Sequence, residues 1–327
     1  MHAFNDRSRV LGRRPDAASQ LAYALAVPFD QVPDIDRMQP SELQRIMARR
    51  QLQADQALLR AAALAPEQPG VLFLAAAQCG AGAACRGVQQ ALLAAEPDNM
   101  AAWLMEMGWA RLRDDQEGGR IAFEQAAQAT RYDTHADTRL QVMVDAYGDS
   151  PLPAECSSKQ EQAAMRRETG MRHDFGMLDQ ALLLASVSRA LPAYIDISRQ
   201  CVPQTSEAVA EPRRAACRKI LARMADGDTL IEQSIALGAM VQLLADAPEA
   251  SAWRQRYREH HWMLAQMADT SVHSMMRMED YALEEVRAYR ALLEAAGRWP
   301  PPIDWLPADE HARSLFQTGR PPPKPPR

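Results

Sequence analysis

The sequence predicts an all-α protein made of paired helices, and three observations support this. Alanine, which has the highest helix propensity, is the commonest residue. No segment alternates apolar and polar side chains with the period of two that a half-buried strand requires. Residues 62–68 and 93–99, which start 31 positions apart, both end an Ala/Leu-rich run with a proline and polar residues. A period in the low thirties is typical of helix-turn-helix repeats, whose units bury their apolar faces by stacking.

The composition is that of a folded chain with no electrostatic preference for nucleic acid. Of the 327 residues, 47% are hydrophobic and 24% are charged, which is enough apolar surface for a large core. A net charge of −5 argues against a surface that binds nucleic acid or an anionic membrane. No apolar run reaches the ~20 residues of a membrane span. Residues 1–14 are polar and basic, unlike a signal peptide, and whether a signal peptide has been removed stays open.

The first 150 residues are predicted to hold an N-terminal extension followed by helical repeats. The extension, 1–40, includes one short helix near 17–26. The repeat region, 41–150, begins with Ser41, which forms a capping-box pattern with Gln44. The helices predicted in this region, each bounded by proline, glycine or capping residues, span 41–64, 69–78, 86–95, 99–113, 117–130 and 135–147.

A proline-rich stretch at 148–153 marks the predicted start of a C-terminal helical domain, 151–298. In this domain Asp228 and Thr229 are predicted to cap a helix. From Trp299 the chain is broken by prolines, and we expect a proline-rich tail, 299–327, with one short helix near 304–317. The helices predicted in the C-terminal domain span 158–169, 174–190, 192–200, 206–225, 228–246, 248–266 and 269–297.

Four of the five cysteines form two pairs that flank short connections between helices. Cys79 and Cys85 enclose a glycine-rich loop, and Cys201 and Cys217 enclose a proline-containing segment. A disulfide in each place would pin one helix to the next, which predicts a periplasmic or secreted protein. Cys156 is left over. The alternative is five reduced thiols that pack as small apolar side chains in a cytoplasmic protein.

The segment from Pro97 to Trp103 resembles the junction between tetratricopeptide repeats, in which a proline ends one helix pair and an aromatic residue begins the next. Gly108 and Phe123 resemble the small and aromatic positions of such a repeat, and the resemblance covers roughly 50–131. It implies an α-solenoid of stacked antiparallel helix pairs that binds a protein or peptide in a concave groove, here followed by a C-terminal helical bundle. It implies no catalytic chemistry.

One predicted helix carries the best candidate for a binding surface. Trp253, Tyr257 and His261 repeat at helical spacing on one face, with His260 beside them. Aromatic residues are common at interface hot spots, so these four residues are the predicted binding set. The alternative is that they pack on the next helix. Glu259 beside the two histidines suggests a second alternative, a general base or a metal site, although adjacent histidines on a helix point about 100° apart.

Other patterns give weaker indications of chemistry. Gly80 and Gly82 imitate a dinucleotide fingerprint, but the run before them is helical where that fingerprint needs a strand. Asp133, His135 and Asp137 alternate in a turn and could ligate a cation, although the first turn of a helix favours acidic residues anyway. We therefore predict neither a cofactor nor a metal.

These observations together predict a non-enzymatic helical-repeat protein that binds a protein or peptide, as a scaffold or as an inhibitor or immunity-type protein of the bacterial envelope. The alternative function is a helical hydrolase or metal enzyme that uses Glu259, His260 or His261.

Overall fold

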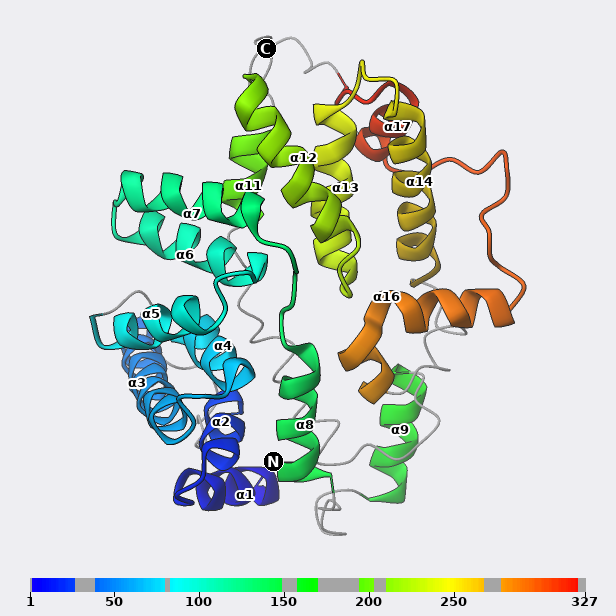
Figure 1. The fold of residues 1–327 in the computed structure, drawn as a ribbon. Coiled ribbons are helices and arrows are strands. Elements are labelled where there is room, and N and C mark those ends of the chain that lie inside the picture. The colour runs from blue at the N-terminus through cyan, green and yellow to red at the C-terminus, as the bar shows by residue number, and fades with distance from the viewer. Residues whose placement is uncertain are drawn as a thin grey trace. The chain divides into compact units, whose positions relative to one another are not determined.

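The computed structural model describes residues 2–26, 39–79, 83–148, 158–169, 194–202, 210–267 and 278–322. Throughout these ranges the regular elements are helices, and the sole β-type pairing is an isolated bridge between Asn99 and Arg131 (Figure 1). The predicted all-α class is therefore confirmed. No helix in the described ranges is both long and apolar enough to cross a membrane. The predicted helix at 174–190, the fifth cysteine (Cys156) and the last five residues of the tail lie outside the described residues.

The chain forms two compact units that are discontinuous in sequence, whereas the predicted domains are continuous. The first unit contains residues 1–97, 134–168 and 173–191, and the second contains 98–133, 169–172 and 192–327. The chain returns to the first unit at residue 134 because the next helix packs on two earlier helices of that unit.

The first unit is built from helices that mostly begin and end where the sequence predicted. They are α1 (His2–Gly12), α2 (Ala17–Leu25), α3 (Pro40–Leu64), α4 (Pro69–Gln78), α5 (Arg86–Ala95), α8 (Ala136–Tyr147) and α9 (Lys159–Thr169), the last residue of α9 excepted. Leu21, Leu58, Leu72 and Leu92 are fully buried in its core. Gly70 lies where an added Cβ would clash with Thr138, so a glycine allows α8 to approach α4.

Two expectations for the first unit are wrong. The helix at 40–64 is not capped by Ser41: Gln39 is the N-cap and Pro40 occupies the first turn, where its missing N–H costs nothing. Residues 2–12, expected to be part of a mostly polar extension, form α1. Two of its polar side chains, Asn5 and Ser8, are buried, and the Ser8 hydroxyl lies 2.9 Å from the Tyr147 hydroxyl on α8. A tertiary hydrogen bond therefore makes a polar segment part of the core.

The second unit contains the helices of the α6–α7 pair and most of the C-terminal half. They are α6 (Met100–Leu112), α7 (Gln116–Gln128), α11 (Tyr194–Cys201), α12 (Glu211–Ala225), α13 (Leu230–Leu243), α14 (Ala250–Met267), α16 (Met278–Ala295) and α17 (Glu310–Thr318). Sequence neighbours pack on each other, in particular α6 on α7, α12 on α13 and α13 on α14. Leu104, Ile220, Met224 and Leu237 are buried in its main core.

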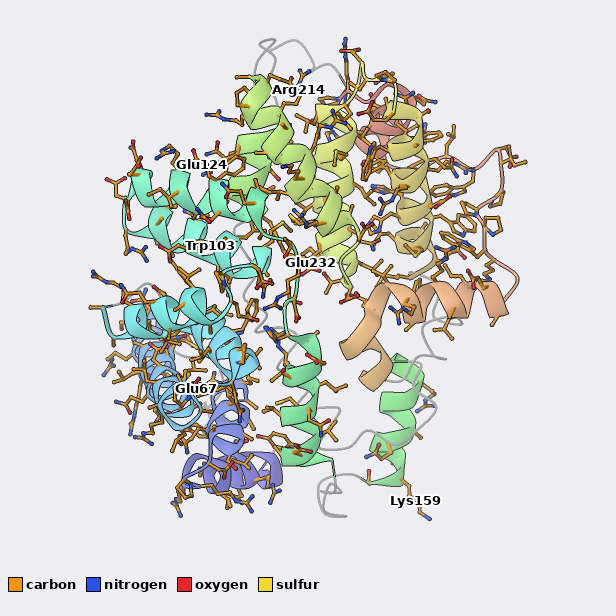
Figure 2. The ribbon with its side chains drawn as sticks, viewed as in Figure 1. Glu67, Trp103, Glu124, Lys159, Arg214 and Glu232 are labelled. Atoms are coloured by element: carbon orange, nitrogen blue, oxygen red, sulfur yellow. A yellow bond between two sulfur atoms is a disulfide. The ribbon has the colours of Figure 1, made fainter. Side chains whose placement is uncertain are left out.

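The Thr229 hydroxyl accepts a hydrogen bond from the Glu232 N–H at 3.2 Å, which confirms the predicted cap of α13. Glu232 itself lies at the N-terminal end of α13 (Figure 2), is 3% exposed, and accepts a hydrogen bond from the Tyr194 hydroxyl at 2.9 Å. Burial raises the pKa of the Glu232 carboxyl, while the bond from Tyr194 opposes that rise.

Both predicted cysteine pairs are at disulfide distance. The Cα atoms of Cys79 and Cys85 are 5.7 Å apart in the first unit, and those of Cys201 and Cys217 are 5.4 Å apart in the second. Each pair links the end of one helix to the next, as the spacing predicted.

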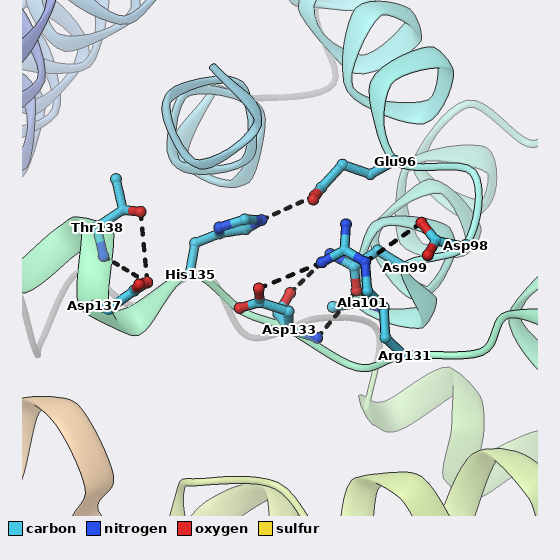
Figure 3. A network of polar contacts seen from close by, with 9 residues as sticks. All are labelled: Glu96, Asp98, Asn99, Ala101, Arg131, Asp133, His135, Asp137 and Thr138. Atoms are coloured by element: carbon cyan, nitrogen blue, oxygen red, sulfur yellow. Dashed lines mark hydrogen bonds and ion pairs between the residues drawn. The ribbon is translucent and has the colours of Figure 1, made fainter. Parts of the chain in front are cut away.

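At the Pro97-Asp98-Asn99 junction, the side chain of Asn99 caps the N-terminus of α6 (Figure 3). Its side-chain oxygen accepts from the Ala101 N–H and from the Asp133 N–H, each at 3.1 Å, and its amide donates to the Asp133 carbonyl at 2.9 Å. The Met100 N–H also donates to the Arg131 carbonyl at 2.9 Å. One buried side chain thus caps α6 and holds the chain that follows α7.

Candidate functional site

A groove of about 740 Å³ lies in the second unit between α6, α7, α11 and α12. Five of its residues lie on α7 at helical spacing, so one face of that helix forms a wall: Gln116, Gly119, Arg120, Phe123 and Glu124. The other walls come from Met107 and Arg111 on α6, the turn residues Asp114 and Asp115, Asp196 and Gln200 on α11, and Pro212, Arg213 and Ala216 on α12.

The turn between α6 and α7 has a defined geometry. The Asp115 carboxylate accepts from the Gly118 N–H at 2.8 Å and so caps α7. An added Cβ at Gly118 would clash with that carboxylate, which explains the glycine. Asp114 adopts a left-handed backbone conformation with a φ of 57°, which is uncommon for a residue with a side chain. The turn therefore presents two carboxylates at one end of the groove.

Most charges along the groove are already paired. Arg111 Nε lies 2.9 Å from the Asp196 carboxylate, and their side chains are 50% and 12% exposed. Arg120 pairs with Glu124 within α7, at 2.5 Å. Asp114 and Arg213 form no ion pair with another described residue. The groove thus offers the carboxylate of Asp114 and the guanidinium of Arg213 together with the apolar side chains of Met107, Phe123 and Ala216.

The groove is lined by polar, charged and apolar side chains. It holds no serine, cysteine, lysine or histidine, although four of its residues carry carboxyl groups: Asp114, Asp115, Glu124 and Asp196. It does hold two side-chain amides, Gln116 and Gln200, that can both donate and accept hydrogen bonds. An extended peptide needs donors and acceptors of this kind, apolar contacts and a few charges.

The residues that the sequence singled out lie on α14, outside this groove. Trp253 is half-buried against the main core, Tyr257 is 4% exposed and His260 is 1% exposed. His261 is half-buried, and its ring centroid lies 4.3 Å from that of Tyr257. In this structure these side chains pack within the unit, and a role for them in binding stays a prediction.

His260 makes a short contact with Ser234 on α13: its Nε2 lies 2.5 Å from the Ser234 hydroxyl. Ser234 and Tyr257 line a hollow of about 310 Å³, so a serine beside a histidine faces open space. However, His260 Nδ1 is buried and has no hydrogen-bond partner that could orient the ring. Burial, with a contribution from His261, lowers the pKa of His260 to about 3, so it is neutral at pH 7 and a very weak base.

Glu259, His260 and His261, the alternative catalytic or metal-binding residues on α14, do not point toward one common site. Glu259 accepts a hydrogen bond from Gln255 at 3.0 Å, while His260 turns toward Ser234. The rings of His260 and His261 are 6.0 Å apart and nearly perpendicular. Burial lowers the pKa of His261, and the negative charge of Asp309 opposes that decrease. These contacts favour packing over catalysis.

The residues first considered as cation ligands have protein partners of their own (Figure 3). In the first unit, His135 Nε2 lies 2.9 Å from the buried Glu96 carboxylate, and Asp137 accepts from the Thr138 N–H at 2.7 Å. In the second unit, Asp133 lies 3.4 Å from Arg131. His135 is the N-cap residue of α8, and Asp137 lies in its first turn, as the helix-start interpretation expected.

The groove residues were not among those predicted from the sequence. The signal that could have found part of them is the spacing on α7, where positions 116, 119, 120, 123 and 124 form one helical face around Phe123. The contributions of α11 and α12 depend on tertiary packing and leave no sequence signal. Comparison of the chain with protein-family models, with curated proteins and with solved structures found no match.

Proposed function

We propose that this chain is a non-enzymatic helical-repeat protein that binds a protein or peptide segment in the groove of its second unit. The groove is the observation that carries the proposal, because it combines a volume of about 740 Å³ with apolar and polar side chains from four helices. The tight α6–α7 pair and its junction at Asn99 support a tetratricopeptide-like arrangement of the pairs. Scaffold and inhibitor roles both require such a groove.

The lining indicates the chemistry of the partner segment. Met107, Phe123 and Ala216 suit one or two small apolar side chains, while Gln116 and Gln200 suit the amides of an extended backbone. Asp114 would attract a basic residue and Arg213 an acidic one. The proposed partner is therefore an extended segment with charges of both signs around an apolar centre.

The cysteine pairs support a proposal for the compartment. Two cysteine pairs at disulfide distance support a periplasmic or secreted protein, where disulfides persist. The proposal therefore places the partner in the bacterial envelope or outside the cell.

Site-specific photo-cross-linking tests the groove directly. A photoreactive amino acid replaces Gln116 on α7, Gln200 on α11 or, as control, the exposed Gln255 on α14 of the same unit. In cells of the source organism, we expect the same protein to be captured from Gln116 and Gln200 but not from Gln255. Adding Ala216→Arg, which fills the groove, should abolish the capture. Equal capture from Gln255, or capture that survives Ala216→Arg, would contradict the assignment.

A further inference from the structure

A second hollow, in the first unit, is lined by three arginines. It has a volume of about 210 Å³ and lies where the end of α1 meets α2 and α3. Arg9 and Arg13 approach it from α1 and the turn that follows, and Arg60 from α3. No carboxylate lines it, which is unusual in a chain whose net charge is −5.

The turn that carries Arg13 is held in place by buried hydrogen bonds. Gln20, which is 3% exposed, donates from its amide to the Gly12 carbonyl at 3.1 Å and to the Arg14 carbonyl at 2.7 Å. Asp16 caps α2 by accepting from the Ser19 N–H at 2.8 Å. Because these bonds lie on both sides of Arg13, its backbone is positioned before any ligand binds, which lowers the entropy cost of binding.

The facing wall is one side of α3. Gln53, Gln56 and Arg60 fall at i, i+3 and i+7, and the buried Ala57 lies between them. Tyr23 on α2 also lines the hollow, and its ring lies against Gly12, where an added Cβ would be 2.9 Å from the ring. The walls therefore bring two amides and a phenol beside the guanidinium groups.

Two of the three arginines that line the hollow have no ionic partner among the described residues. Arg13 and Arg60 form no ion pair with another described residue. Arg9 pairs with Asp6 at 2.7 Å. The like charges of Arg13 and Arg60 beside one small space repel each other, and an anion placed between them would remove that repulsion.

We propose that this hollow binds a tetrahedral oxyanion of the phosphate class. A planar carboxylate is satisfied by the fork of one arginine, whereas arginines that line one hollow from the turn after α1 and from α3 can bind oxygens that point in several directions. The hollow, at about 210 Å³, is large enough for a phosphate group, free or as a small monoester. The site is separate from the groove of the second unit and does not depend on the function proposed for it.

Calorimetric titration of the full chain with inorganic phosphate, at constant ionic strength in chloride buffer, tests this site. We expect saturable binding at one site, weakened about tenfold or more by Arg13→Gln or Arg60→Gln, because each removes a charge-assisted hydrogen bond. Arg45→Gln, an exposed position on α3 outside the hollow, is the matched control and should leave the affinity unchanged. Glycerol phosphate in place of phosphate distinguishes a monoester site from one for the free anion.

A charge inserted into the hollow gives an independent measurement. Gln56→Glu should abolish phosphate binding and raise the thermal midpoint in phosphate-free buffer, because the new carboxylate lies among the arginines. All of these substitutions except Arg13→Gln are on α3, and every replaced residue is exposed, so the fold should tolerate them. Two results would overturn the proposal: no saturable heat with either phosphate or glycerol phosphate, or equal affinity in the Arg60→Gln and Arg45→Gln variants.

Discussion

Replacing Asn99 by alanine should destabilise the second unit by more than the loss of a helix cap. The side chain is 0% exposed and makes three hydrogen bonds, one that caps α6 and two that hold Asp133. Loss of an N-cap costs about 1 kcal/mol. The two bonds to Asp133 contribute about 1 kcal/mol each. We therefore expect the free energy of unfolding to fall by about 3 kcal/mol on the sum of these values.

The α6–α7 pair offers a matched control. Asp115 caps α7 through the Gly118 N–H on the surface and makes no second tertiary bond of this kind, so Asp115→Ala should cost only about 1 kcal/mol. Asn99→Asp keeps the oxygen that accepts from Ala101 but puts a buried acceptor oxygen in place of the amide that donates to the Asp133 carbonyl, so it should also cost more than Asp115→Ala.

Urea unfolding followed by tryptophan fluorescence measures this effect selectively. All six tryptophans lie in residue ranges of the second unit, so the signal reports on that unit alone. An unchanged slope with denaturant concentration would show that the variants unfold over the same surface. The reasoning is refuted if Asn99→Ala loses no more stability than Asp115→Ala.

Three further predictions concern buried groups of the second unit. The raised pKa of Glu232 means that the folded state holds its proton more tightly than the unfolded state. The wild type should therefore lose stability as the pH rises from about 4 through that raised pKa. The free energy of unfolding of Glu232→Gln should depend less on pH over this range, and an equal pH dependence in both proteins would contradict the prediction. Replacing Cys201 and Cys217 by alanine should lower the free energy of unfolding by about 3 kcal/mol, and titration of the unreduced wild type in denaturant should find one free thiol, not five. Ser234→Ala should lower the free energy of unfolding by about 1–3 kcal/mol because it leaves the buried His260 Nε2 without its partner. A fluorophosphonate probe should not label Ser234 in the wild type, whereas labelling would favour a hydrolase.

Much of the local structure could be predicted because its causes are local. The ends of α4 and α5 agree with the prediction to the residue, since prolines and capping positions there leave few alternatives. The two cysteine pairs were also predictable, because each spans a short connection between helices. α1 was not predictable, because its polar Ser8 is stabilised by Tyr147, which lies 139 residues away.

The candidate sites also combine features that local sequence predicts with features that depend on tertiary packing. The sequence alone determined that this chain is helical, where most helices begin and end, and which cysteines pair, because propensity, capping and short-range closure act over a few residues. Only the tertiary structure decided that Tyr257 and His260 are buried, that α11 and α12 complete a groove with α7, and that Arg13 and Arg60 line one hollow. These features depend on which helix faces pack together, and the packing of distant segments is decided by the whole core at once.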